Sequence, residues 1–216
     1  MPFTRRHFIT TAAAALCCPV GVRALPLDMG WQHQTFPRKD SNSFTPGPRS
    51  ITVQSNDSVS LLMRQLPQAQ WGAVQANWKW DVSTTVPPTD LTRKGGDDRN
   101  LALYFVFLPA RDATRLSGAS ARKVLGARAA RMLIYTWGGD YPRGAVFNNP
   151  WLRGKGATVA MRPAGTGSHH ETVDLHADFA RAFDRDPGVL FGLALSADSD
   201  DTESRISAQI SDLTLG

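Results

Sequence analysis

The sequence predicts a mainly β protein: a jelly-roll-like antiparallel β-sandwich with one or two inserted helices. Residues 74–82 alternate strictly between apolar and polar side chains, and many short apolar runs are separated by turn-forming clusters. Successive side chains of a strand lie on opposite faces, so strict alternation indicates a sheet with one buried face. Closely spaced short strands are typical of a sandwich. No repeat of about 34 or 40 residues, which would indicate a solenoid or a propeller, is visible.

The first 24 residues predict a removable export signal. Arg5 and Arg6 are adjacent, Phe8 opens an alanine-rich apolar run, and small residues lead to Ala24. This order is typical of a twin-arginine signal peptide, which a receptor reads. The apolar run is too short and too interrupted to span a bilayer comfortably. We expect the twin-arginine translocase and signal peptidase as partners, cleavage after Ala24, a periplasmic or secreted location, and a mature domain that does not span the membrane. A membrane anchor and an ordinary secretory signal are the alternatives.

Removing this leader changes the composition. The full chain of 216 residues has 24 basic and 19 acidic side chains, for a net charge of +5. Three arginines leave with the leader, so residues 25–216 retain 21 basic and 19 acidic side chains, a net charge of +2. That bias is too weak to predict nucleic-acid binding. Both cysteines, Cys17 and Cys18, also leave, which excludes disulfides, thiol nucleophiles and cysteine metal ligands from the mature domain.

Residues 25–49 are expected to form an irregular N-terminal segment, because several prolines break any long element, with 31–36 as a candidate short strand. The sandwich domain is expected over residues 50–216. Continuous apolar runs at 101–108 and 189–195 predict strands buried on both faces. The remaining strands are expected at 51–53, 59–63, 74–82, 132–137, 157–161 and 206–215.

Two segments have helical composition. Residues 112–128 favour a helix but contain two glycines, and residues 174–184 place apolar side chains at helical spacing behind a capping Asp174. In the last strand, the apolar alternation slips by one position after Ile210, which predicts a β-bulge.

Aromatic side chains divide into two groups. Trp78 and Trp80 lie on the apolar face of their strand, so we expect them in the core. Four others lie in or beside the glycine-rich loop 138–156, where a ligand can reach them. They are the candidate ligand-binding residues: Trp137, Tyr141, Phe147 and Trp151. Sugar rings, which are apolar on one side, stack on such rings, although a loop that packs its own aromatics is an equal alternative.

An acidic turn near the last strand is a candidate calcium site. Asp198, Asp200 and Asp201 offer oxygen ligands at the short spacing that Ca²⁺ requires. The turn lacks the ligand ladder of an EF-hand loop. The alternative is a hydrated turn whose side chains close their own backbone hydrogen bonds. No other cofactor is expected.

A second acidic pair, Asp97-Asp98, is expected to be structural. Adjacent carboxylates on an extended chain point in different directions, so they make a poor acid–base couple. We expect them to bond loop amides or to pair with Arg93, Lys94 or Arg99. A glycosidase site would need the loops of the two acidic segments to meet. The adjacent histidines His169 and His170 lack metal-ligand spacing and are expected in an exposed loop.

Three stretches resemble an uncharacterised family of secreted bacterial proteins known only as a domain of unknown function. They are Asn-Trp-Lys-Trp-Asp-Val at 77–82, the loop 90–99 that ends in paired aspartates, and the acidic turn 197–202. The resemblance covers roughly residues 50–215. It implies a jelly-roll fold, distantly similar to carbohydrate-binding modules, and almost no chemistry. Where the family tends to keep an arginine at the start of a buried strand, this chain has Asn100, preceded by Arg99.

No reaction centre is evident: there is no nucleophile elbow and no phosphate-binding glycine loop, so we expect no catalytic residue. The sequence therefore favours a non-catalytic, periplasmic binding module for a glycan or envelope polymer. Two alternatives stay open. One is a carbohydrate-active hydrolase or lyase that uses loop carboxylates, and the other is a structural envelope protein that acts through a protein partner.

Overall fold

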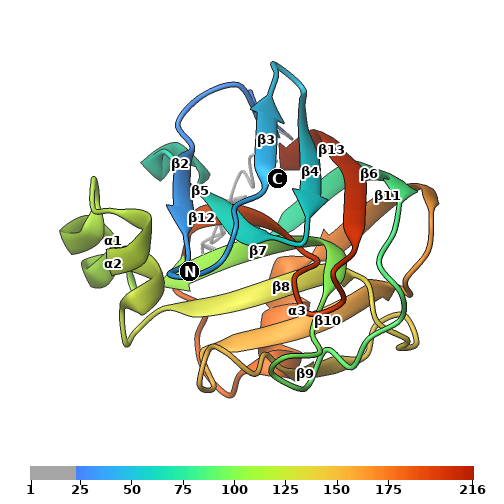
Figure 1. Cartoon of the computed structure of the whole chain (residues 1–216). Coiled ribbons are helices and arrows are strands. Elements are labelled where there is room, and N and C mark those ends of the chain that lie inside the picture. The colour runs from blue at the N-terminus through green and yellow to red at the C-terminus, as the bar shows by residue number, and fades with distance from the viewer. Residues whose placement is uncertain (1–22) are drawn as a thin grey trace, which may run out of the picture.

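The computed structural model describes residues 23–216, which form two packed sheets (Figure 1). The export residues Arg5, Arg6 and Phe8 lie outside the described residues. Within them, no helix is long and apolar enough to cross a membrane.

The first sheet is antiparallel throughout. In spatial order its strands are β11 (Gly167–Asp174), β6 (Gln75–Thr84), β13 (Arg205–Leu215), β4 (Ser50–Asn56) and β3 (Ser43–Pro46), with the short β1 (Arg23–Ala24) also paired to β13. The last strand of the described chain thus lies in the interior of this sheet.

The second sheet carries one parallel pair. Its order is β2 (Gln32–Thr35), β5 (Val59–Gln65), β12 (Val189–Asp198), β7 (Arg99–Leu108), β8 (Arg131–Trp137), β10 (Gly156–Arg162) and β9 (Val146–Asn148). Only β8 and β10 run parallel. The predicted β-sandwich is confirmed, with this one departure from an antiparallel arrangement.

The main core lies between the sheets and is rich in aromatic rings. Trp78 and Trp80 are fully buried on the inner face of β6, as the alternation predicts. Their ring centroids are 5.4 Å apart at an edge-to-face angle of 85°, a geometry that aromatic quadrupoles favour. From the opposite sheet Tyr135 packs on Trp78 and Trp137 packs on Trp80.

A second core explains why β7 and β12 are apolar on both faces. Helices α1 (Ala110–Leu116) and α2 (Ala121–Gly126) cover the outer face of the second sheet and bury Leu116 and Val124 there. The helix-forming segment expected at 112–128 forms two helices separated around Gly118, whose φ of 74° ends the first, so the described chain has three α-helices where one or two were expected. The third helix, α3 (Leu175–Ala182), begins with the expected cap: Asp174 accepts from the N–H of Ala177 at 2.9 Å.

The structure differs from the sequence prediction in the N-terminal segment. Residues 25–49, expected to be irregular, contribute β2 to one sheet and β3 to the other, and bury Leu25 and Leu27 in the main core. The segment is thus part of the sandwich. The predicted bulge in β13 is confirmed, because its register against β6 shifts between Ser211 and Thr214.

The predicted exposed loop around His169 and His170 is instead strand β11, which pairs with β6 along its whole length. Its side chains alternate, so His169 is half-buried, His170 is exposed, and Glu171 is fully buried. The prediction of an exposed loop was wrong because glycine, serine and histidine are poor strand formers, and pairing with β6 overrides that local preference.

Candidate functional site

Two acidic segments that are distant in sequence lie side by side. Asp97 and Asp98 immediately precede β7, while Asp198 ends β12, and the two strands are antiparallel neighbours with Arg99 opposite Asp198. In such a pair the start of one strand lies beside the end of the other. The loop containing Asp97-Asp98 and the acidic turn therefore meet, and they do so because β7 and β12 are neighbours in the sheet.

Arg99 connects the two segments. Its Nη1 donates to Asp97 Oδ2 at 3.2 Å and to Asp198 Oδ2 at 3.0 Å, and its Nη2 donates to the Tyr104 hydroxyl at 3.1 Å. The arginine side chain is only 9% exposed, so these carboxylates compensate a charge that would be costly to bury alone. Gly138 passes so close that an added Cβ would lie 2.7 Å from the Cβ of Arg99.

Asp98 holds the acidic turn in place. Its Oδ1 accepts from the N–H of Asp201 at 3.2 Å, and its Oδ2 accepts from both the N–H and the hydroxyl of Thr202, at 2.8 and 2.5 Å. The carboxylate is fully buried. It therefore bonds amides of the turn 103 and 104 positions away rather than those of its own loop.

Carboxylates from both segments converge in what we call the aspartate cluster, defined as Asp98, Asp198 and Asp200. Each offers one oxygen, and the three oxygens lie within 4.8 Å of one another. Asp201, expected as a ligand, is not in this group. Asp98 was expected to have a structural role only, and nothing in the sequence signals that it joins Asp198.

The electrostatics of the cluster are unbalanced. Burial raises the pKa of Asp198 to about 7, and the nearby carboxylates of Asp97 and Asp98 add to this, against the opposing charge of Arg99. One oxygen of Asp198, Oδ1, has no hydrogen-bond partner among the described residues. The ammonium of Lys39 forms an ion pair with Asp200 at the edge of the cluster.

The candidate aromatic residues differ in accessibility. Trp137 is 1% exposed and lies between Trp80 and His169, with centroids at 5.6 and 4.9 Å, so the expectation that a ligand can reach it was wrong. It ends a strand that is buried on both faces. Tyr141 and Phe147 are half-buried and pack on one another at 4.6 Å.

Trp151 is the exposed member of the group, at 56%. It follows an Asn149-Pro150 turn in which Asn149 Oδ1 accepts from the N–H of Trp151 at 3.1 Å. The indole Nε1 donates to both oxygens of Asp97, at 3.0 and 2.9 Å, and the ammonium of Lys94 lies 4.9 Å from the ring centroid. Through Asp97 the ring is fixed to the same network as Arg99.

A buried carboxylate that sequence reasoning missed lies on β11, an edge strand of the first sheet. Glu171 is 0% exposed and accepts from Trp80 Nε1 at 3.2 Å and from Arg162 Nε at 2.8 Å. Arg143 Nη2 lies 2.6 Å from its second oxygen. Burial alone would raise the pKa of Glu171, but the hydrogen bonds from Arg162 and Arg143 outweigh it and lower that pKa. Residues 167–174 show no alternation of apolar and polar side chains, so no local pattern indicates that Glu171 is buried.

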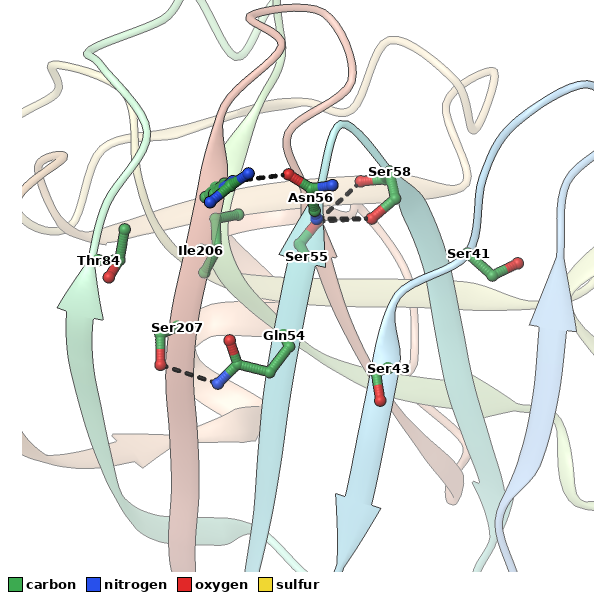
Figure 2. A pocket seen from close by; sticks show the side chains of 10 residues that line it. Ser41, Ser43, Gln54, Ser55, Asn56, Ser58, Thr84, Ile206 and Ser207 are labelled. Carbon is green, nitrogen blue, oxygen red and sulfur yellow. Dashed lines mark hydrogen bonds between the residues drawn. The ribbon is translucent and has the colours of Figure 1, made fainter.

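The outer face of the first sheet carries two adjoining depressions, which we call the polar grooves. One, of about 480 Å³, lies over β4 and β13, and Figure 2 shows hydroxyl and amide side chains around it. There Gln54 Nε2 donates to Ser207 Oγ at 2.9 Å. The second, of about 720 Å³, lies over β13, β6 and the start of β11, and shares Ser207 with the first. No aromatic ring lines either groove.

Comparison with known proteins places the chain in a family. Residues 29–214 match the family described as "Protein of unknown function (DUF3047)". The chain belongs to this family. The resemblance expected from the tryptophan-rich strand and the acidic segments is thereby confirmed for DUF3047. No curated protein matches the chain.

Solved structures with similar backbones are distant in sequence. The xyloglucanase domain of NopAA, a type three effector from Sinorhizobium fredii solved with cellobiose, has a TM-score of 0.47 and 8% identity. The similarity covers 92% of the present chain and 99% of the NopAA domain. The family 11 carbohydrate-binding module of the cellulosomal cellulase Lic26A-Cel5E from Clostridium thermocellum has a TM-score of 0.45 and 7% identity, with coverages of 92% and 95%. The family 11 xylanase from Neocallimastix patriciarum has a TM-score of 0.43 and 12% identity, with coverages of 90% and 95%.

Proposed function

We propose that this protein binds a neutral glycan or envelope polymer, without cleaving it, along the polar grooves of the first sheet. The observation that carries the proposal is the lining itself: a continuous face of serine, threonine, glutamine and asparagine side chains over β4, β13 and β6. Sugar hydroxyls both donate and accept hydrogen bonds, as these side chains do. An open face built on paired strands holds such groups in fixed positions, which suits an extended chain of sugars.

The charges of the lining favour a neutral ligand. Only Arg205 and Asp81 carry a formal charge among the residues that line the two grooves. Hydrolysis of a glycosidic bond ordinarily requires two carboxyl groups flanking that bond. With a single carboxylate in the lining, the hydrolase alternative receives no support there. The apolar lining residues are Val82, Ile206 and Ala208, all buried, so the grooves do not offer the large apolar patch that a protein partner would cover.

The exposed ring of Trp151 is proposed as a second contact surface, together with Tyr141 and Phe147. A tryptophan whose N–H is already bonded to Asp97 loses little freedom when a sugar stacks on it, and the face away from Lys94 is the one proposed for stacking. Binding in the grooves and binding at the Trp151 ring depend on different residues, so substitutions distinguish the two surfaces.

Calorimetric titration of the protein with neutral glucan oligosaccharides and an anionic oligouronate tests the proposal. Gln54→Ala and Ser207→Ala each remove a groove hydrogen-bonding group, and we expect each to weaken binding of the neutral ligand about five-fold, equivalent to roughly 1 kcal/mol. Trp151→Ala reports on the loop surface. Gln68→Ala is the matched control, because Gln68 lies exposed in the 3-10 turn η1 (Gln68–Gln70), which lines neither groove.

Three outcomes would overturn the proposal: no heat with any oligosaccharide, preference for the oligouronate, or release of new reducing ends from a polysaccharide. A loss of affinity in Trp151→Ala alone would move the site from the grooves to the loop.

We also propose export by the twin-arginine route. The paired Arg5 and Arg6, the alanine-rich run and the small residues before Leu25 support it, as does a cysteine-free domain, which can fold before transport without an oxidising compartment. Replacing both arginines by lysine should leave the full-length precursor in the cytoplasm, as fractionation and immunoblotting would show. Export of that variant at the normal level would contradict the proposal.

A further inference from the structure

We propose that the aspartate cluster is a calcium site, in which a bound Ca²⁺ replaces the ammonium of Lys39. The inference does not depend on glycan binding. It is carried by the convergence of Asp98, Asp198 and Asp200 together with an unpartnered oxygen on Asp198.

The spacing of the oxygens suits a single calcium ion. Ca²⁺ binds oxygen ligands at 2.3–2.6 Å, so two ligands on opposite sides of it lie about 4.8 Å apart. The three cluster oxygens lie within 4.8 Å of one another and therefore fit one coordination sphere. Mg²⁺, with bonds of about 2.1 Å, would draw the same oxygens closer. The cluster contains no sulfur or imidazole, so the donor set is that of a hard cation rather than zinc.

The second observation is the state of Asp198. Its side chain is 9% exposed, and its Oδ2 accepts from Arg99, but its Oδ1 has no hydrogen-bond partner among the described residues. A buried carboxylate oxygen normally has a hydrogen-bond partner, because leaving a buried charged group unsatisfied destabilises the fold. The Asp198 carboxylate lies against those of Asp98 and Asp200. A cation among them would give this oxygen its missing partner.

The surrounding charges call for further positive charge. Five carboxyl groups gather here, on Asp97, Asp98, Asp198, Asp200 and Asp201, and the cationic groups in contact with them are those of Arg99 and Lys39. Arg99 is held by five bonds that position it between strands, so it cannot move toward Asp200.

Lys39 differs from Arg99 because it is free to leave. Its side chain is 44% exposed, and its described partner is Asp200. It lies between β2 and β3, on a loop that the solvent reaches. Calcium and the Lys39 ammonium would therefore compete for the Asp200 carboxylate, which gives the site a built-in competitor.

The test is calorimetric titration of the full chain, stripped with a chelator, with CaCl₂ and separately with MgCl₂. We expect one calcium per chain, weaker binding of magnesium, and a rise in Tm of roughly 5–10 °C at a calcium concentration of about 100 times Kd. Asp198→Asn keeps the shape and an acceptor for Arg99 but removes charge, so calcium affinity should fall at least ten-fold.

Lys39→Met provides a result that general damage to the fold cannot imitate, because removing the competitor should increase calcium affinity several-fold. Asp112→Asn is the matched control: Asp112 lies on α1 and pairs with Arg115, and its loss should leave calcium affinity unchanged. The proposal is overturned if neither the wild type nor Lys39→Met binds calcium, if Asp198→Asn binds as tightly as the wild type, or if magnesium binds more tightly than calcium.

Discussion

Replacing Glu171 by glutamine should destabilise the sandwich by an amount that depends on pH. The glutamine keeps a carbonyl oxygen for Trp80 but loses the charge that attracts Arg162 and Arg143. A hydrogen bond to a charged group contributes about 1.5–3 kcal/mol. The two arginine side chains are 29% and 48% exposed and can rehydrate, so we reduce the sum of their contributions by about half. We therefore expect a loss of about 1.5–3 kcal/mol at pH 7.

The sign of the pH dependence follows from the lowered pKa of Glu171. The unfolded chain binds a proton at the ordinary pKa, near 4.5, while the folded chain resists protonation until a lower pH. The stabilisation by the charged carboxylate is thus fully present above the unfolded pKa and disappears as pH falls through the folded pKa. The difference in free energy of unfolding between wild type and Glu171→Gln should shrink below about pH 4.5.

Urea denaturation of both proteins from pH 7 down to the lowest pH at which the wild type folds measures this difference. Glu203→Gln is the matched control, because Glu203 is exposed and the same chemical change there should alter stability by less than about 0.5 kcal/mol. If the difference for Glu171→Gln stays constant over the whole pH range, the buried charge is not what stabilises this edge of the sandwich.

Three further predictions concern packing and processing. Trp78→Ala should cost about 3–5 kcal/mol in urea denaturation, because the ring is fully buried. Trp151→Ala should cost less, about 1–2 kcal/mol, because the ring is exposed and the main loss is its hydrogen bond to Asp97; equal losses would contradict the assigned burial. Gly192→Ala should destabilise by about 1–3 kcal/mol, since the added Cβ would lie 2.7 Å from a carbonyl oxygen of β5. Gly126→Ala, at the end of α2, has open space for its Cβ and should be neutral or slightly stabilising in the same measurement. Sequencing the N-terminus of the exported protein should give Leu25 as the first residue, and any other start would reject cleavage after Ala24.

Features that depend on local periodicity were predictable from the sequence. The alternation around Trp78 and Trp80 is enough to place both rings inside, because a strand has a period of two. The cap at Asp174 and the bulge after Ile210 likewise depend on a few consecutive residues, and both occur in the structure.

Features that depend on strand order were not predictable. Asp98 and Asp198 meet because β7 and β12 are neighbours, and nothing within either segment specifies that pairing. The accessibility of Trp137 was misjudged for a related reason: it adjoins a glycine-rich loop, but its strand is covered on both sides by elements from elsewhere in the chain. Glu171 went unnoticed because charged residues are rarely buried unless paired, and its arginine partners come from other segments.

The place of β13 in the first sheet constrains the order of folding. It follows every other strand in the described chain, yet it lies between β6 and β4 and also holds β1. Until residues 205–215 have paired, β6 and β4 have no common neighbour in this sheet. Closure of this sheet therefore waits for β13, and a nonsense mutation shortly before residue 205 would leave β11 with β6 and β4 with β3 as two unjoined half-sheets rather than a slightly shortened domain.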